Sequence, residues 1–134
     1  MYAKFHLNLM KLCKFRKFVI SGAGIGPMTA EVISKIMTTN QNFGDYNISG
    51  NLIGDEGIIK IADALQNDNC KHIMSLDVNT NSLSNEGISH LLKSISNNES
   101  LIDLNISSKT KEGKNKNKMG DRACRILKDL LTNN

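Results

Sequence analysis

Residues 43–65, FGDYNISGNLIGDEGIIKIADAL, hold the pattern that decides the fold. The first half alternates apolar Phe43, Tyr46 and Ile48 with polar residues, which indicates a short strand with one buried face. After a turn, the second half spaces its apolar residues by three and four positions, as in a helix with one buried face: Ile58, Ile61, Ala62 and Leu65. Asp55 precedes this pattern and is expected to cap the helix. The stretch therefore predicts a strand, a turn and a helix.

The same unit recurs along the chain. A shift of 28 residues towards the N-terminus aligns Ile20, Ile25, Ile33 and Met37 with Ile48, Ile53, Ile61 and Leu65. A shift of 30 residues towards the C-terminus aligns Ile48, Ile53, Ile61 and Leu65 with Val78, Leu83, Leu91 and Ile95. A further shift of 28 residues aligns Ile73, Leu76 and Val78 with Leu101, Leu104 and Ile106. A lysine-rich insert at 109–118 then delays the register by eight residues, and it resumes with Asn117, Met119, Cys124, Leu127 and Leu131. These shifts predict four repeats, at 15–42, 43–72, 73–100 and 101–134.

This pattern resembles the leucine-rich repeat family, in its longer ribonuclease-inhibitor-like form of about 28 residues per repeat. The family motif L-x-x-L-x-L-x-x-N-x-L reads FGDYNISGNLI and IMSLDVNTNSL in this chain. The resemblance implies an α/β right-handed solenoid of about four strand–turn–helix coils, with a parallel sheet on the concave side and the helices outside. It also implies that the turn asparagines bond backbone groups of the neighbouring coil, and these are Asn51, Asn81 and Asn117. The first repeat has Ala23 at this position, which predicts a looser turn.

Composition limits the class and the compartment. The three cysteines are an odd number without metal-ligand spacing, which favours a reduced, cytoplasmic protein, with nuclear, cytoskeletal or ciliary association left open. Cys124 falls on a core position of a predicted helix, whereas Cys70 falls in a polar loop. No apolar run is long enough to cross a membrane, so we expect no membrane partner.

The N-terminal segment, residues 1–14, is basic and has apolar residues at helical spacing. We interpret it as the helix of a preceding partial coil that covers the first repeat. A basic, acid-free targeting helix is the alternative interpretation.

Enzymatic interpretations find little support. The turn GAGIG resembles a dinucleotide-binding loop at Gly22 and Gly24, but the third glycine is replaced by Pro27, which suits the first turn of a helix. Ran GTPase-activating proteins share this repeat type and use an arginine in a loop after an early strand. The matching loops, at 22–26 and 50–54, contain no arginine. His6, His72 and His90 show no metal-like spacing. We expect no catalytic residue, cofactor, metal or small-molecule substrate.

The expected function is protein binding on the concave face of the sheet. Strand positions that alternate with the core predict a surface on which three aspartates select basic groups and two apolar residues add contact. The candidate residues are Arg16, Lys17, Asp45, Asn47, Met74, Asp77, Asn79, Ile102, Asp103 and Asn105.

A second hypothesis places function in the basic insert. Its lysines would attract an acidic protein, a nucleic acid or a microtubule surface, whereas a solvated loop is the simplest interpretation. The insert contains no aromatic residue, which argues against nucleic acid. The residues concerned are Lys109, Lys111, Lys114, Lys116 and Lys118. Neither end of the repeat array has an obvious polar cap, so self-association through the ends is also open.

Overall fold

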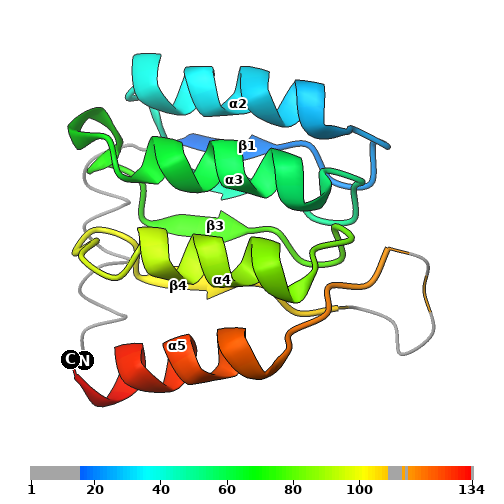
Figure 1. Cartoon of the computed structure of the whole chain (residues 1–134). Coiled ribbons are helices and arrows are strands. Elements are labelled where there is room, and N and C mark those ends of the chain that lie inside the picture. The colour runs from blue at the N-terminus through cyan, green and yellow to red at the C-terminus, as the bar shows by residue number, and fades with distance from the viewer. Residues whose placement is uncertain (1–15, 109–112, 114, 134) are drawn as a thin grey trace.

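Each strand of the protein is followed by a helix, and this unit repeats along the chain. The computed structural model describes residues 16–108, 113 and 115–133. In chain order the elements are β1 (Arg16–Val19), α2 (Pro27–Thr39), β2 (Phe43–Asn47), α3 (Gly54–Leu65), η1 (Asp68–Cys70), β3 (Ser75–Asp77), α4 (Asn85–Ser94), β4 (Asp103–Asn105) and α5 (Asp121–Thr132). Figure 1 shows the strand–helix units stacked one above another. The helix expected within residues 1–14 lies outside the described residues.

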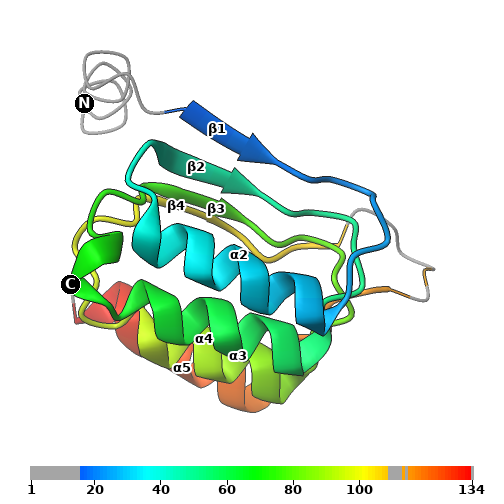
Figure 2. The ribbon, with the colours of Figure 1, turned by 90° about the horizontal axis from the view of Figure 1, so that it is seen from above.

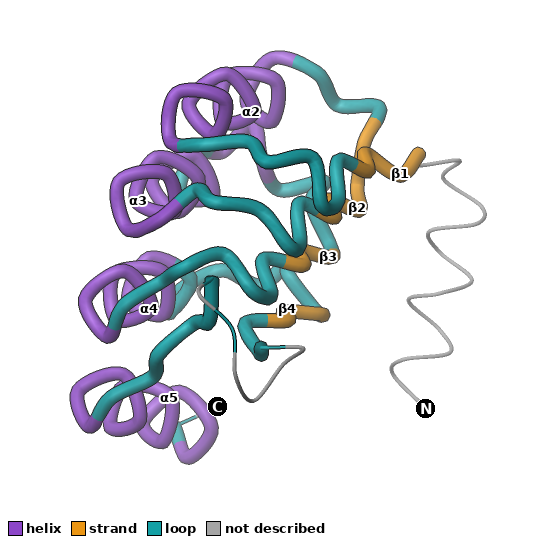
Figure 3. The backbone as a smooth tube through the Cα atoms, turned by 90° about the vertical axis from the view of Figure 1, so that its right-hand side faces the viewer, coloured by secondary structure: helices purple, strands orange, loops and turns teal. Residues whose placement is uncertain are grey.

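The strands form one parallel sheet with the order β1–β2–β3–β4 (Figure 2). In Figure 3 the helices lie together on one side of this sheet, so each strand, turn and helix makes one coil. This arrangement is consistent with the expected leucine-rich-repeat-like solenoid. No helix in the described part of the chain is long and apolar enough to span a membrane.

The core lies between the sheet and the helices and is built from the repeated apolar positions. In the second coil Tyr46, Ile48, Ile53, Ile58 and Ile61 are fully buried, which confirms both the strand and the helix pattern read from residues 43–65. Their third-coil counterparts are at most 1% exposed: Leu76, Val78, Leu83, Ile88 and Leu91. Each fully buried side chain of this kind contributes about 1.5–3 kcal/mol relative to an exposed one. The first-coil helix positions are buried as well, with Ala30 at 0% and Ile33 at 1% exposure. The remaining counterparts packed against the core are only partly buried: Phe18, Ile25, Leu104, Ile106 and Leu127.

Buried asparagines join successive coils, as the family resemblance implies. The Asn51 Oδ1 accepts hydrogen bonds from the amides of Ala23, at 2.9 Å, and Ile25, at 3.3 Å, in the preceding coil. Its Nδ2 lies 2.7 Å from the Ile20 carbonyl oxygen and 2.8 Å from that of Ile48. The first turn is therefore stabilised by the second coil, although it has no asparagine of its own.

Asn81 and Asn117 repeat this arrangement at the next two junctions. Asn81 Nδ2 donates to the Ile48 carbonyl at 2.9 Å, and Asn117 Nδ2 donates to the Val78 carbonyl at 3.0 Å. Because a buried amide or carbonyl left unpaired costs about 1–3 kcal/mol, these side chains stabilise the turns as well as the junctions.

Asp55 does not cap its own helix, which corrects the expectation from sequence. Helix α3 begins at Gly54, and Ile53 is its N-cap residue without a side-chain hydrogen bond. The Asp55 carboxylate instead reaches the next coil, where it accepts hydrogen bonds from the Ser84 amide, at 2.8 Å, and the Ser84 hydroxyl. Thirty positions on, Asn85 Oδ1 accepts from the Gly120 amide at 3.0 Å and from the Ala123 amide at 3.1 Å. One side chain at the start of α3 and one at the start of α4 thus bond to the beginning of the following helix, and in α4 the N-cap residue Ser84 caps the helix with its own side chain.

The burial of the two described cysteines is the reverse of the expectation from sequence. Cys70 is fully buried, and its Sγ donates a hydrogen bond to the Met37 carbonyl oxygen at 3.3 Å. The polar run around it closes the short helix η1, which turns the thiol inward. Cys124, expected in the core, is exposed, because no described coil covers the outer side of α5.

Candidate protein-binding face

The face of the sheet that carries no helix in the described part of the chain is called the open face here. Strand register arranges its side chains in two rows. The first row is Lys17, Asp45, Ser75 and Asp103, and the second row is Val19, Asn47, Asp77 and Asn105. The predicted aspartates therefore do not form one line, because Asp77 lies one row away from the other two.

The second row is occupied by strand-end hydrogen bonds. Asn47 Oδ1 accepts from the amide of Ser49 at 3.1 Å and from its hydroxyl at 2.7 Å. Asp77 Oδ1 accepts from the amide of Asn79 at 3.0 Å and from its Nδ2 at 2.6 Å. Asn105 holds Ser107 in the same way, with distances of 3.1 and 2.7 Å. These side chains turn the backbone at the ends of the strands, so part of their hydrogen-bonding capacity is used inside the molecule.

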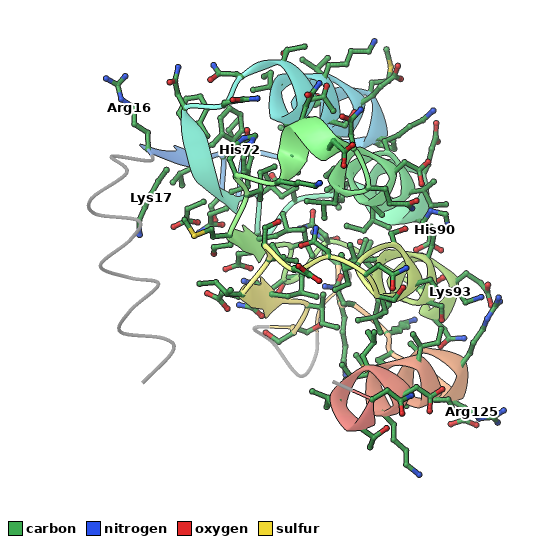
Figure 4. All side chains as sticks on the ribbon, turned by 90° about the vertical axis from the view of Figure 1, so that its left-hand side faces the viewer. Arg16, Lys17, His72, His90, Lys93 and Arg125 are labelled. Carbon is green, nitrogen blue, oxygen red and sulfur yellow. The ribbon has the colours of Figure 1, made fainter. Side chains whose placement is uncertain are left out.

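The first row carries most of the charge of the open face. Lys17 Nζ lies 3.4 Å from Asp45 Oδ2, and Lys17 is 73% exposed whereas Asp45 is 18% exposed. Asp103, at the other edge of the sheet, is exposed and forms no ion pair with the described residues. Figure 4 shows Arg16 and Lys17 on the sheet side of the molecule, and His90, Lys93 and Arg125 on the helix side. Among the described residues, Asp103 is thus the open-face carboxylate that forms neither an ion pair with a lysine nor a strand-end hydrogen bond.

Two members of the predicted contact set are buried. Met74 is 7% exposed and Asn79 is 1% exposed, so neither side chain is available on the open face. Asn79 is buried because its Nδ2 turns back to Asp77. Ile102, which stands directly before β4, is 44% exposed and remains available for contact.

The basic insert is described only in part. Lys109, Lys111 and Lys114 lie outside the described residues, whereas Lys116 and Lys118 are exposed. The backbone at the end of the insert is tied to the third coil, since the Lys118 amide donates to the Leu83 carbonyl oxygen at 2.7 Å. The hypothesis of a basic docking loop stays a prediction. Replacing Lys109, Lys111 and Lys114 by glutamine tests it and keeps the hydrogen bond between the Lys118 amide and the Leu83 carbonyl oxygen.

The glycine turn of the first coil has its amides engaged. Gly22 and Gly24 adopt left-handed backbone angles, with φ of +63° and +67°. The Gly22 amide donates to the Ser49 carbonyl oxygen at 2.9 Å, and the amides of Ala23 and Ile25 donate to Asn51 Oδ1. A dinucleotide-binding loop binds its pyrophosphate through free backbone amides, whereas the Gly22, Ala23 and Ile25 amides of this turn donate hydrogen bonds to the second coil.

His90 of helix α4 forms a side-chain contact at the surface. His90 Nε2 lies 2.8 Å from Asp63 Oδ1, across the junction of α3 and α4. Within the described residues, no three His, Cys, Asp or Glu side chains are grouped so as to hold a metal ion.

Comparison with known proteins finds distant relatives. A 66-residue stretch is 29% identical to the human NACHT, LRR and PYD domains-containing protein 3 and covers 48% of this chain and 6% of that protein. The mouse protein of the same name is 25% identical over 120 residues, which is 87% of this chain and 11% of the relative. The chain therefore spans about a tenth or less of the length of these curated relatives. No protein-family model matches the chain. The similarity suggests repeats of the leucine-rich type and hints at a role in protein interaction.

Proposed function

We propose that this chain is a leucine-rich repeat protein of the ribonuclease-inhibitor-like form, and that it acts as a non-catalytic protein-interaction module. Three observations support the proposal: the coil-to-coil asparagine bonds, the strand–helix stacking and the distant relatives whose names include the repeat. The free thiols Cys70 and Cys124 support a reducing, cytoplasmic location as part of the same proposal.

We infer further that a protein segment binds the open face. The observation that carries this inference is the exposed carboxylate of Asp103, beside the exposed apolar side chain of Ile102 at the start of β4. A carboxylate gives orientation and an apolar neighbour gives buried area, the combination from which protein interfaces gain specificity and affinity. The expected partner presents a lysine or arginine next to an apolar residue.

Charge reversal at Asp103 tests this function better than reversal at the other two aspartates. Removing Asp45 would also break its ion pair with Lys17, and removing Asp77 would release Asn79, so either change alters the sheet itself. The experiment is affinity capture from cell extract with wild type, Asp103→Lys and the matched control Glu99→Lys. Glu99 is exposed in the loop that precedes β4 and carries the same charge.

The expected result is a protein captured by wild type and by the control but lost with Asp103→Lys. Equal capture by all three chains would contradict binding through Asp103. A lysine-to-glutamine change at Lys109, Lys111 and Lys114 that alone abolished capture would instead favour the basic insert.

A further inference from the structure

We propose that the basic N-terminal segment, residues 1–15, binds the open face of its own chain and competes there with the partner. The inference rests on the proposed function and adds a means of regulating the same site. The segment suits the face because its sequence has the pattern expected of the partner, a lysine next to an apolar residue. The two pairs are Lys4–Phe5 and Lys11–Leu12.

The charge of the segment is opposite to that of the coils that carry most of the open face. Residues 1–15 lie outside the described residues, and their sequence contains Lys4, Lys11 and Lys14 and no acidic residue. Residues 43–108 contain nine acidic residues against three lysines, a net charge of −6. A surface of one sign attracts a segment of the other sign and raises its local concentration.

The first coil is the other place that the sequence offers for this segment, but its charge has the same sign. Residues 16–42 contain three basic residues and one acidic residue, a net charge of +2. The acidic residue, Glu31, already pairs with Lys35, with 3.2 Å between Oε1 and Nζ. The lysines of the segment therefore find their opposite charges on the open face and not at the first helix.

Two carboxylates of the open face have oxygens available for these lysines. Asp103 is exposed and forms no ion pair with the described residues. Asp77 accepts through Oδ1 from Asn79, at 3.0 and 2.6 Å, and its Oδ2 accepts no hydrogen bond from the described part of the chain. A basic side chain can therefore bind at either aspartate without breaking a contact of the sheet.

The open face also has apolar side chains for the apolar residues of the segment. Ile102 is 44% exposed and Val19 is 59% exposed. In the segment Phe5, Leu9 and Leu12 are spaced by four and three positions, which places them on one side of a helix. Covering these groups removes apolar area from water and adds affinity to the charge contacts.

The segment is long enough to reach both aspartates. It joins the sheet at Arg16, whose amide donates to the Asn42 carbonyl oxygen at 2.8 Å and which lies on the sheet side of the molecule in Figure 4. Asp103 lies three strands from β1, a distance of about 14 Å at the usual strand spacing. A helix of the length of residues 1–15 spans about 22 Å, so its lysines can extend across the whole sheet.

A ligand within the same chain competes strongly even when its own affinity is low. Its effective concentration is about 1 mM, so a segment with an intrinsic Kd of about 0.1 mM occupies the face roughly nine-tenths of the time. A free ligand then binds about tenfold more weakly than it would to a vacant face. The open face thus admits a partner that binds more tightly than the segment does.

The experiment measures binding of a fluorescein-labelled peptide with the sequence of residues 1–15 to the full chain, by fluorescence anisotropy under reducing conditions. Wild type should bind the peptide weakly, because the face is occupied. The variant Lys4→Glu/Lys11→Glu/Lys14→Glu should bind it about tenfold more tightly, because the face is vacant.

The matched control is Lys60→Glu/Lys93→Glu/Lys128→Glu. It makes the same change of net charge at exposed lysines of α3, α4 and α5, so it should bind the peptide like wild type. Adding Asp103→Lys to the N-terminal variant should remove the tenfold gain. Circular dichroism checks that all of these variants fold.

A second measurement reads the contact in wild type itself. A carbodiimide joins a lysine to a carboxylate with which it is in contact, and mass spectrometry of the digested monomer identifies the joined residues. We expect lysines of residues 1–15 to be joined to Asp77 or Asp103. Joining to Glu31 of the first coil alone would overturn the proposal.

Equal binding of the peptide by wild type and the N-terminal variant would also overturn it, as would a lack of binding to that variant up to roughly 1 mM. A gain that persists after Asp103→Lys would place the segment elsewhere and contradict the proposal. The proposed function fails by a different result, which is partner capture that does not depend on Asp103. Capture that depends on Asp103, together with equal peptide binding, would refute the segment and keep the binding face.

Discussion

Asn117 holds Asn81 in place from the far side of the lysine-rich insert: its Oδ1 accepts a hydrogen bond from the Asn81 amide at 2.8 Å. The same oxygen lies 3.0 Å from the Leu83 amide, and Nδ2 lies 3.0 Å from the Val78 carbonyl oxygen. The insert therefore leaves the geometry of the last junction unchanged, because the residue that closes the junction comes after it.

Replacing Asn117 by alanine should destabilise the protein strongly. The change leaves the Asn81 and Leu83 amides unpaired in a buried site, and each such group costs about 1–3 kcal/mol. We expect the free energy of unfolding to fall by roughly 3 kcal/mol, as measured by urea denaturation. Asn69→Ala, at an exposed side chain, is the control and should change it little. A similar small effect for both variants would contradict the structural role of Asn117.

Gly57 should not tolerate a side chain. An added Cβ would lie 2.9 Å from the Cβ atoms of Ala30 and Ile53, which are fixed to the backbone and cannot rotate away. We expect Gly57→Ala to cost about 1–3 kcal/mol, more than the gain of roughly 0.5–1 kcal/mol that alanine usually brings within a helix. Gly26→Ala is the control, since nothing lies within 4 Å of its Cβ position. Thermal unfolding compares them, and a stabilised Gly57→Ala would show that α2 and α3 are further apart than described.

The Tyr46 hydroxyl is buried and has no hydrogen-bond partner in the described part of the chain. Its ring packs against Phe18 and Phe43, with centroid distances of 5.2 and 6.3 Å. Tyr46→Phe keeps the ring contacts and removes the unpaired group, so we expect stability to rise by about 1 kcal/mol. A loss of stability, seen by urea denaturation, would mean that the hydroxyl is satisfied in solution.

The protein should lose stability in alkali because of Cys70. Burial raises the pKa of its thiol from 9.0 to about 11. Between these values the unfolded chain has released the thiol proton while the native chain still binds it, so stability falls as pH rises, by at most about 1.4 kcal/mol per pH unit.

The contribution of Cys70 is isolated by measuring the midpoint of urea unfolding across this pH window in wild type, Cys70→Ala and Cys124→Ala. The pH dependence of the midpoint should flatten in Cys70→Ala and persist in Cys124→Ala. Burial also raises the pKa of Tyr46, to about 12, so some dependence should remain at the alkaline end. An unchanged slope in Cys70→Ala would rule out this origin.

Periodicity predicted the coils well, because burial between sheet and helices imposes the same spacing on every repeat. Asn117 could be found beyond an insert since a buried junction tolerates few other side chains. The prediction that Asp55 caps its own helix is wrong because a carboxylate bonds to whichever donors lie nearest in space, and these are the amide and hydroxyl of Ser84. Cys124 has core spacing yet is exposed, because spacing identifies a face and not the neighbour that covers it.

The open face shows the same limit. Alternation identified which strand residues face away from the helices, but sheet register placed Asp77 in a different row from Asp45 and Asp103. Local hydrogen bonds then buried Asn79, and an ion pair engaged Asp45. The burial of Asn79 and the ion pair of Asp45 both depend on contacts between side chains, and the apolar–polar alternation of a single strand does not describe such contacts.

The most direct test of the proposed binding face is selection of peptides from a random display library on the immobilised chain. Enriched peptides are then measured against wild type, Asp103→Lys and Glu99→Lys. We predict that the enriched peptides carry lysine or arginine beside an apolar residue. Their binding should be about tenfold weaker to Asp103→Lys, equivalent to roughly 1.4 kcal/mol, and unchanged to Glu99→Lys. Peptides without basic residues, or peptides that bind Asp103→Lys as tightly as wild type, would contradict it.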